Sequence, residues 1–321
     1  RAERMEGKRA SRKEIRDAAE AVKAAVAARP TISRLWEQYQ QASLDRKDSK
    51  TDQSRYELHL KPLFEQKTPD EIFTLDIDKL RHKLLKSGRS PQTVKHVIAL
   101  LQRIIRFGVK KGLCFAPEPS KLHFEMPQVD NQKTESFTAE QLQKYLEAID
   151  EEPDQNAAAF LRLALATGMR KGALMALQWV DINFDSGFIM LRGDAAKKGR
   201  TEKIPLSDTA RMILTNIQRA ESPFVFPGRN GGQRKDFRKI AERVKEKAGL
   251  PADFRPLHGL RHAYASFLAS SGQVDLYTLQ KLLTHSSPQM TQRYAHLADE
   301  ALQRAASVID TCILCNLEKE K

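Results

Sequence analysis

Residues 256–296 read PLHGLRHAYASFLASSGQVDLYTLQKLLTHSSPQMTQRYAH, and the rest of the chain is organised around this stretch. Its apolar spacing and its punctuation predict helices that are separated by short turns. His258 and Arg261 lie three residues apart, so on a helix they share a face, one turn from each other. Gly272 is expected to end that helix.

A later helix is predicted from Ser287 and Pro288, which are typical of an N-cap followed by proline at the first helical position. Tyr294 then falls about two turns into this helix, where a phenol is held firmly. With His285 just upstream, the stretch combines a tyrosine, histidines and an arginine. These residue types suit attack on a phosphodiester.

The composition favours a folded protein with a polyanionic partner. The chain has 321 residues, enough for two domains, with 40% apolar and 30% charged residues. Its formal net charge of +13 points to nucleic acid first and to an anionic membrane surface second. No apolar run approaches the roughly 18 residues of a spanning helix, and no signal-peptide pattern opens the chain. The partner expected is therefore nucleic acid, with no membrane.

The N-terminal half is predicted to be helical throughout. Residues 1–29 form a basic helical arm or a connector to an upstream domain, and Pro30 stops that helix. Four amphipathic patterns follow without a strand pattern between them, which indicates a small helical bundle. Their apolar faces are Ile32, Leu35, Trp36 and Tyr39; Tyr56, Leu60, Leu63 and Phe64; Ile77, Leu80 and Leu84; and Val94, Val97, Ile98, Leu101 and Ile105.

The basic excess is concentrated in this half. Residues 1–130 carry 27 lysines and arginines against 18 acidic residues, a net of +9, which leaves +4 of the total +13 for the rest. This distribution is expected if the bundle grips a phosphate backbone, although solvated surface charge is the alternative for each residue. The DNA-binding residues that we predict are Lys95, Arg103, Arg106, Lys110 and Lys111.

In the C-terminal half, Thr138 and Gln141 form a capping box, and residues 155–167 form an apolar helix. Gly168 ends this helix, and Arg170 lies at the turn before the next one. A buried arginine requires an anionic partner. The sequence leaves two alternatives equal for Arg170: a functional anion, or an ion pair with a carboxylate such as Asp181.

A small antiparallel sheet is predicted after that turn. The segment DINFDSGFIMLRG, residues 181–193, reads as a β-hairpin around Asp185-Ser186-Gly187. A second turn, AAKKGRTE, leads into KIPL and adds a third strand. Lys197 and Lys198 lie at the tip of this second hairpin, where a lysine is solvated or brings an ammonium group to a leaving oxygen.

The order of these motifs carries more information than any one of them. It is TGMR, a hairpin lysine before KIPL, LHGLRH, THSS, and a tyrosine followed by Ala-His. This series resembles the tyrosine recombinase (phage integrase) family over about residues 31–310. The family's six catalytic positions fall on residues of the expected type: Arg170, Lys197, His258, Arg261, His285 and Tyr294.

The resemblance implies an α+β fold that is mostly α: a helical core-binding bundle, a linker, and a mainly helical catalytic domain with a small antiparallel sheet. It implies a site-specific DNA recombinase, or integrase, that cleaves and rejoins DNA through a 3′-phosphotyrosyl intermediate for a phage or another mobile element. The domains expected are a basic arm at 1–29, the DNA-binding bundle at 30–115, a linker at 116–134, the catalytic domain at 135–310 and a tail at 311–321.

The chemistry explains these residue types. A free tyrosine has a pKa near 10, so its phenol needs a base and a field that favours the phenolate. Arg170 and Arg261 are suited to hold the non-bridging oxygens, and His285 adds a donor. His258 can shuttle the phenol's proton, and the resemblance assigns protonation of the leaving 5′ oxygen to Lys197. No cofactor and no metal ion are expected.

Two departures from the family pattern concern the surroundings of Arg170. Ala173 stands where the family usually has glutamate, which is expected to loosen the support of the helix behind Arg170. Thr284 stands where glycine commonly precedes the second histidine. Neither departure removes a catalytic group.

Three alternatives remain. A metal-dependent nuclease would use the i, i+4 pair His258 and His262 with His285 or His296, but Arg261 on the same turn would repel a cation. A DNA-binding regulator would share the fold without the activity. A topoisomerase-like enzyme would share the phosphotyrosyl step and relax DNA without exchanging strands between duplexes.

The resemblance also implies the assembly and its setting: double-stranded DNA, a homotetramer on that DNA, accessory DNA-bending proteins, and the cytoplasm of a bacterial or phage-infected cell, at the nucleoid. Cys312 and Cys315 form a CxxC pair without a partner pair, so we interpret them as small apolar residues of a terminal helix. The tail beyond Asp310 is expected to pack on a neighbouring protomer or on its own domain.

Overall fold

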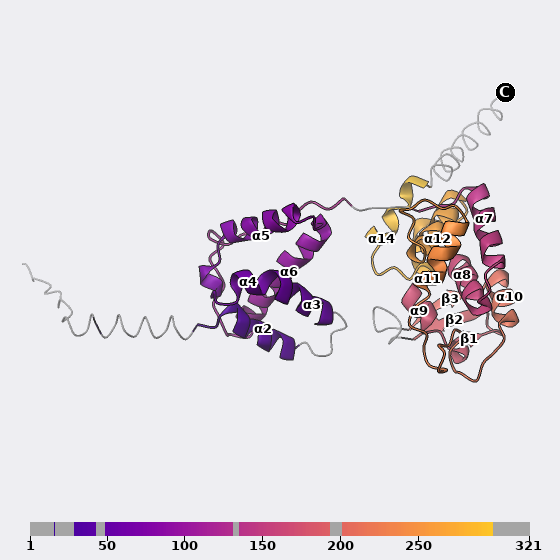
Figure 1. The fold of residues 1–321 in the computed structure, drawn as a ribbon, viewed down its shortest axis with the longest axis horizontal. Helices are drawn as coiled ribbons and strands as arrows, with labels where there is room; N and C mark the ends of the chain where they lie inside the picture. The colour runs from indigo at the N-terminus through magenta and orange to yellow at the C-terminus, as the bar shows by residue number, and fades with distance from the viewer. Residues whose placement is uncertain (1–15, 17–28, 43–48, 131–134, 193–200, 298–321) are drawn as a thin grey trace, which may run out of the picture. The chain divides into compact units, whose positions relative to one another are not determined.

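The structure is a computed structural model that describes residue 16 and residues 29–42, 49–130, 135–192 and 201–297 (Figure 1). The chain divides into two compact units, with the division after Asn131. The N-terminal unit and the C-terminal unit each have an apolar core of their own.

The N-terminal unit is helical in its described residues, as the sequence predicts. The hydroxyl groups of Thr31 and Ser90 accept hydrogen bonds from first-turn N–H groups, so they cap the first and last of its long helices. Its elements are α2 (Ile32–Gln41), α3 (Ser49–Arg55), a π-helical turn (Tyr56–Leu60), α4 (Lys61–Phe64), a 3-10 turn (Pro69–Glu71), α5 (Thr74–Lys86) and α6 (Pro91–Lys110).

The second of the four predicted helices is interrupted by the π-helical turn. Tyr56, Leu60 and Phe64 are buried as predicted, but Leu63 is 37% exposed, so its place on the buried face was wrong. A π turn inserts an extra residue and rotates the following turn relative to a regular helix. The first residue of this turn, Tyr56, stacks on Trp36, with ring centroids 4.4 Å apart and an interplanar angle of 13°.

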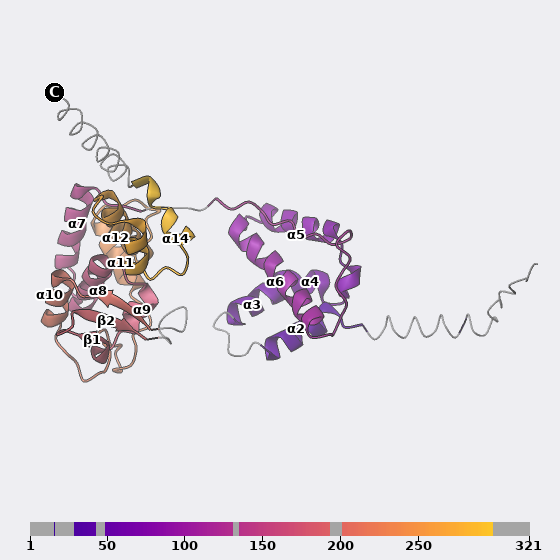
Figure 2. The same ribbon diagram turned by 180° about the vertical axis from the view of Figure 1, so that it is seen from behind.

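Helix α6 forms the centre of this unit and lies against α2, α5 and the π-helical turn (Figures 1 and 2). Its predicted apolar face is confirmed, because every residue assigned to it is buried. A buried carboxylate, that of Asp52, also faces α6: it pairs with Arg55 at 3.1 Å and with Arg103 at 3.0 Å. The core of this unit therefore includes one ion-paired acid.

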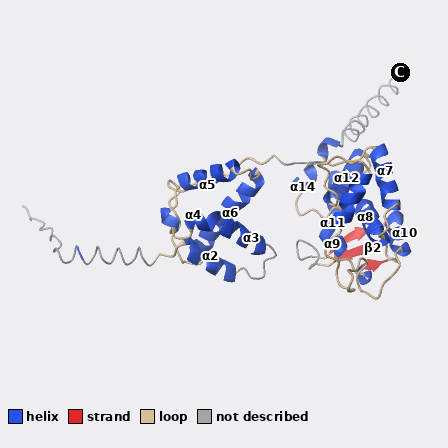
Figure 3. Ribbon diagram, in the orientation of Figure 1, coloured by secondary structure: helices blue, strands red, loops and turns tan. Residues whose placement is uncertain are grey.

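The C-terminal unit combines eight α-helices and two 3-10 turns, Trp179–Asp181 and Ala295–Leu297, with one small sheet in its described residues (Figure 3). The strands β1 (Ile182–Asn183), β2 (Phe188–Leu191) and β3 (Glu202–Pro205) are antiparallel in the order β1-β2-β3, with Ile189 opposite Ile182 and Ile204. The predicted three-stranded sheet is confirmed. The helices are α7 (Ala139–Asp150), α8 (Gln155–Thr167), α9 (Lys171–Met175), α10 (Asp208–Asn216), α11 (Arg238–Lys247), α12 (His258–Ser270), α13 (Leu276–Leu282) and α14 (Gln289–Gln292).

Helix α8 lies inside this unit, against α7, α10 and α12. The capping box of Thr138 and Gln141 that opens α7 is present, as predicted. Glu135 ties the start of the unit to Arg255, three residues before α12, because its buried carboxylate accepts the backbone N–H of Arg255 at 2.7 Å and pairs with the guanidinium of the same residue. This contact fixes the segment that leads into α12, the helix that carries three of the polar side chains described below.

Helix α11 begins at Arg238, and the residues just before it contact the helix start and the core. The carboxylate of Asp236 accepts the backbone N–H groups of Phe237 and Arg238, at 3.0 and 3.2 Å. Arg234 instead packs over the Phe237 ring, 4.0 Å from its centroid, and binds Asp154. Asp236 therefore caps the start of α11, and Arg234 packs beside the helix without extending it.

Some predictions lie outside the described residues. They concern almost all of the 1–29 arm, the tail from 298 to 321 with Cys312 and Cys315, and the hairpin tip with Lys197 and Lys198. Among the described residues, no helix combines the length and the apolar character needed to cross a membrane.

Candidate active site

Helix α12 brings together three polar side chains, those of His258, Arg261 and His262. His258 is the first residue of the helix and is exposed, whereas Arg261 and His262 are 5% and 3% exposed. Buried polar groups need hydrogen-bond partners, so the partners of these residues define the site.

Arg261 is held between the C-terminal ends of two helices. Its Nη1 donates to the carbonyl oxygen of Gly168, after α8, at 2.7 Å, and its Nη2 donates to the carbonyl oxygen of Leu283, after α13. Such carbonyl groups lack partners within their helix and carry partial negative charge, so they suit a buried guanidinium. Burial and then the charge of Arg170 lower the pKa of Arg261 to about 10, which leaves it charged at neutral pH.

Gly168 is required at this position for two reasons. Its φ of +59° lies in the left-handed region, and a Cβ atom added to it would overlap the ring of Tyr264. The glycine that ends α8 thus allows the close approach that brings its carbonyl oxygen to Arg261.

Arg170 is the N-cap residue of α9 and reaches the turn after α13. Its Nη1 donates to Oγ1 of Thr284 at 2.6 Å, and its Nη2 donates to the carbonyl oxygen of Thr284 at 2.8 Å. Asp181, the carboxylate named for an ion pair, is not the partner of Arg170, because it pairs with Arg192 at 2.9 Å and accepts the N–H of Gln178. Burial lowers the pKa of Arg170, and the charge of Glu202 acts in the opposite direction. Arg170 and Arg261 therefore converge on one turn, Leu283–Thr284.

His285 follows this turn and is buried. Its Nδ1 lies 2.8 Å from Oγ1 of Thr291, and its backbone N–H donates to the carbonyl oxygen of Gln280. Burial, followed by the charges of Arg261 and Arg170, lowers the pKa of His285 to about 3. The imidazole is consequently neutral at neutral pH, beside two cations.

Tyr294 does not lie in a helix, so the prediction that it falls two turns into one was wrong. Helix α14 has only four residues, its N-cap is Pro288 in place of the predicted Ser287, and it ends before Tyr294. The backbone N–H of Tyr294 donates to the carbonyl oxygen of Thr291, as in a 3-10 turn. The side chain is 2% exposed.

The hydroxyl of Tyr294 lies 2.6 Å from Nδ1 of His262. Burial raises the pKa of Tyr294, while Arg293 and Arg261 act in the opposite direction. Burial, followed by His258 and nearby arginines, lowers the pKa of His262 to about 3. In this arrangement a neutral imidazole holds a protonated phenol.

His262 and Thr284 are the site residues whose roles sequence reasoning missed. His262 was weighed only as a metal ligand, and its position four residues after His258 was the one signal available. His258 itself contacts the His262 ring edge-on, with centroids 4.8 Å apart. Partial burial lowers the pKa of His258, followed by the charges of Arg255 and Arg261.

The described residues contain no group of three or more histidines, cysteines or carboxylates placed to hold a metal ion. Lys197 belongs to residues 193–200, which connect β2 to β3 and lie outside the described residues. Of the six predicted catalytic residues, the structure therefore places five, all in the C-terminal unit.

The predicted DNA-binding residues lie on α6 and at its C-cap, Lys111. At about 100° per residue, positions 95, 103, 106 and 110 fall on one face of the helix. Lys95, Arg106, Lys110 and Lys111 are exposed. Arg103 is partly engaged with the buried carboxylate of Asp52.

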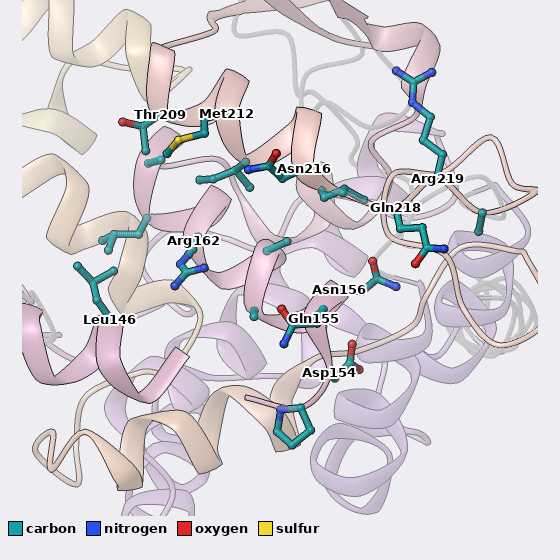
Figure 4. A pocket seen from close by; sticks show the side chains of 18 of the residues that line it. Leu146, Asp154, Gln155, Asn156, Arg162, Thr209, Met212, Asn216, Gln218 and Arg219 are labelled. Carbon is teal, nitrogen blue, oxygen red and sulfur yellow. The ribbon is translucent and has the colours of Figure 1, made fainter. Parts of the chain in front are cut away.

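A large hollow of about 1100 Å³ lies elsewhere in the C-terminal unit, over α7, α8 and α10 (Figure 4). Leu146, Arg162 and Met212 are among the side chains that line it (Figure 4). None of the five predicted catalytic residues that the structure describes lines it. The cluster around Leu283–Thr284 is therefore a separate feature.

Comparison with known proteins gives a consistent picture. The sequence model of the phage integrase family matches residues 135–301. Tyrosine recombinase XerD of Oceanobacillus iheyensis is 28% identical over 268 residues, which are 79% of this chain and 88% of that protein. Tyrosine recombinase XerD of Pseudomonas putida is 30% identical and covers 74% of this chain and 81% of its own length.

Solved structures share the fold. The Tn1549 transposon integrase in complex with transposon right end DNA has a TM-score of 0.72 at 19% identity, covering 86% of this chain and 99% of that chain. A lambda integrase tetramer bound to a Holliday junction has a TM-score of 0.66 at 18% identity, covering 89% of this chain and 87% of that chain. Both alignments span most of the chain.

Proposed function

The chain belongs to the phage integrase family, and on this premise we propose that Tyr294 is the nucleophile of a site-specific DNA recombinase. The enzyme breaks and rejoins DNA strands, as tyrosine recombinases do. The observation that carries the assignment of the site is the convergence of Arg170 and Arg261 on the Leu283–Thr284 turn, immediately before His285.

The two guanidinium groups hold the scissile phosphate in this proposal. Negative charge grows on the non-bridging oxygens in the transition state, and arginine remains charged while it donates in a fixed fork. His285 adds a third hydrogen-bond donor beside the two guanidinium groups. Hydrogen bonds hold all three side chains in place: Arg170 and Arg261 bond the Leu283–Thr284 turn, and His285 bonds Thr291.

The covalent step is a transesterification. The phenol of Tyr294 loses its proton, a bond forms between its oxygen and phosphorus, and the bond from phosphorus to the 5′ oxygen breaks. Lys197 supplies the proton to that oxygen, and His258 relays the phenol's proton. Because one phosphodiester replaces another, the reverse attack by a 5′ hydroxyl rejoins DNA without a nucleotide cofactor.

In the resting structure the phenol is buried against His262 with its pKa raised, so it is a poor nucleophile there. We infer that the segment around Tyr294 moves on DNA binding, which releases the phenol from His262 and brings it to the phosphate. The short α14 and the following 3-10 turn contain few residues to repack in such a movement.

The remaining assignments concern DNA and assembly. We propose that the exposed basic face of α6 grips the phosphate backbone, with residues 30–115 as the core-binding domain, 116–134 as a linker and 135–310 as the catalytic domain. Exchange between two duplexes uses four active sites, so we propose a homotetramer on DNA, which integrates or excises a mobile element. The lambda integrase tetramer on a Holliday junction supports this assembly by likeness of fold.

The test uses a library of nicked duplexes with randomised sequence, because base preferences are not needed in advance. The protein is incubated with the library, and adducts that resist detergent are isolated and sequenced. We expect wild type to form adducts in the presence of EDTA. Tyr294→Phe is expected to form none while it still binds DNA. Adducts that Tyr294→Phe retains would refute Tyr294 as the nucleophile.

The other readings give different results in this assay. A metal-dependent nuclease would lose activity on chelation, and a regulator without activity would bind DNA without forming adducts. An enzyme of the topoisomerase type would relax supercoiled DNA but give no joined recombinant product. Joined products from two duplexes distinguish the recombinase from all three.

A further inference from the structure

Thr284 has a backbone conformation that its residue type disfavours. Its φ is +49°, and it is the single residue other than glycine with a positive φ in the part of the chain that the structure describes. Threonine is branched at Cβ, which makes the left-handed region more costly for it than for most residues. Such an outlier persists when its surroundings hold it there, and outliers of this kind concentrate at functional sites.

The conformation belongs to the turn that ends α13. The N–H of Thr284 donates to the carbonyl oxygen of Lys281 at 2.9 Å, and the N–H of His285 donates to that of Gln280 at 3.0 Å. These two bonds form a Schellman motif, in which the position of Thr284 is usually glycine. The turn would close with glycine at lower cost, so the threonine side chain calls for a reason of its own.

The side chain binds Arg170. The left-handed turn points Oγ1 and the carbonyl oxygen of Thr284 to the same guanidinium, where they accept from Nη1 at 2.6 Å and from Nη2 at 2.8 Å. Two oxygens thus engage both terminal nitrogens, as a bidentate anion would. Unlike a carboxylate, the hydroxyl and the carbonyl are neutral, so they orient Arg170 without cancelling its charge.

We propose that Thr284 is a positioning residue for phosphoryl transfer: its hydroxyl and carbonyl oxygens fix the guanidinium of Arg170 in the orientation that binds the scissile phosphate. The inference rests on the proposed function. Leu283, the preceding residue, holds Arg261 through its carbonyl oxygen. One turn therefore sets the positions of both guanidinium groups relative to His285.

Three substitutions separate the hydroxyl group from the backbone strain. Thr284→Ser keeps the hydroxyl, Thr284→Ala removes it at a similar backbone cost, and Thr284→Gly removes both the hydroxyl and the strain. The rate of adduct formation at saturating DNA is expected to stay within about twofold for Ser and to fall on the order of tenfold or more for Ala and Gly, with DNA affinity unchanged. The Gly variant is expected to have a higher Tm than the Ala variant.

The result that would overturn the proposal is a Gly or Ala variant that cleaves as fast as Ser and wild type. If Thr284 served only to close the turn, the Thr284→Gly variant would be more stable than wild type and fully active. A Thr284→Gly variant that is more stable but cleaves more slowly therefore supports the positioning role.

A second measurement reads the contact without catalysis. The Tm difference between Thr284→Ser and Thr284→Ala is measured with Arg170 present and in an Arg170→Ala background. We expect the Tm of Thr284→Ser to exceed that of Thr284→Ala only when Arg170 is present. An equal Tm difference in both backgrounds would show that the hydroxyl of Thr284 does not bind Arg170. If wild type formed no adduct at all, the proposed function would fail, whereas this comparison would still report whether Thr284 holds Arg170.

Discussion

The hydroxyl of Tyr294 and Nδ1 of His262 lie 2.6 Å apart, and both rings are buried. A hydrogen bond to Nδ1 leaves Nε2 of His262, which has no partner among the described residues. A buried polar atom without a partner costs about 1–3 kcal/mol. Tyr294 therefore satisfies one of the two ring nitrogens of His262, and the loss of this hydrogen bond would leave both without a partner among the described residues.

This residue-scale feature predicts a dependence of stability on pH. The pKa of His262 is lowered to about 3 in the folded protein, below its ordinary value of 6.5, so the unfolded chain binds the proton more tightly. The stabilisation is complete above about pH 6.5 and is lost as the pH falls towards 3, by up to about 1.4 kcal/mol per pH unit for each such histidine.

The measurement compares the Tm of wild type and His262→Gln between pH 7 and pH 5. Glutamine keeps a hydrogen-bond acceptor for the phenol but does not titrate, so its Tm is expected to fall less steeply. His285 titrates in both proteins and serves as the common background. Equal slopes would show that His262 is not held neutral by the fold.

Helix ends are the elements on which the site depends, since the last carbonyl groups of α8 and α13 hold Arg261. Gly168→Ala would place a Cβ atom in the Tyr264 ring at a left-handed φ. We expect a loss of about 2–4 kcal/mol of unfolding free energy and a loss of adduct formation, because the carbonyl oxygen must move.

Gly172→Ala is the matched control for this substitution. Gly172 lies in α9, two residues after Arg170, and a Cβ atom added there meets nothing within 4 Å. Its stability is expected to stay unchanged or to rise by up to about 1 kcal/mol, with cleavage retained. A Gly168→Ala protein as stable and active as Gly172→Ala would contradict this role of the α8 terminus.

The α6 helix gives a prediction that distinguishes two arginines on one face. Arg106→Ala is expected to leave the Tm unchanged and to reduce the slope of log affinity for DNA against log salt by about 0.9, as loss of one phosphate contact does. Arg103→Ala is expected to lower stability by about 1–2 kcal/mol, because the buried Asp52 keeps only Arg55. Thermal unfolding and DNA binding at several salt concentrations measure both, and identical behaviour of the two variants would refute the distinction.

Most helices of the fold were predictable because they carry their own signals. Thr138 caps α7 in the structure as the sequence indicates, and Thr31 and Ser90 cap α2 and α6 in the same way. The segment from Ser287 to Tyr294 was misjudged, because Ser-Pro is equally compatible with a single helical turn. A tertiary contact accompanies the end of α14: the Tyr294 side chain is buried, and its hydroxyl bonds His262, 32 residues away in sequence.

The site was predictable in its residue types and not in its contacts. Motif order identified Arg170 and Arg261. No local pattern shows that both guanidinium groups donate hydrogen bonds to the Leu283–Thr284 turn. Thr284 was noticed only as a departure from the family pattern. Its hydrogen bonds to Arg170 join positions 114 residues apart, which spacing arguments do not reach.

At the scale of the whole molecule, the chain has two compact units with different tasks in the proposed mechanism. The N-terminal unit presents an exposed basic helix face, and the C-terminal unit holds five of the six predicted catalytic residues. This division implies that DNA affinity and DNA cleavage are separable by mutation. The proposed mechanism depends on one bond, between the Tyr294 oxygen and a DNA phosphorus.

The most direct test identifies that bond. Trapped adducts are digested with trypsin and nuclease, the modified peptide is sequenced by mass spectrometry, and the released DNA end is tested for labelling by polynucleotide kinase. We predict a nucleotide 3′-phosphate on the peptide that carries Tyr294 and a free 5′ hydroxyl on the other strand end. A modification on another residue, or a linkage through a 5′ phosphate, would contradict the assignment.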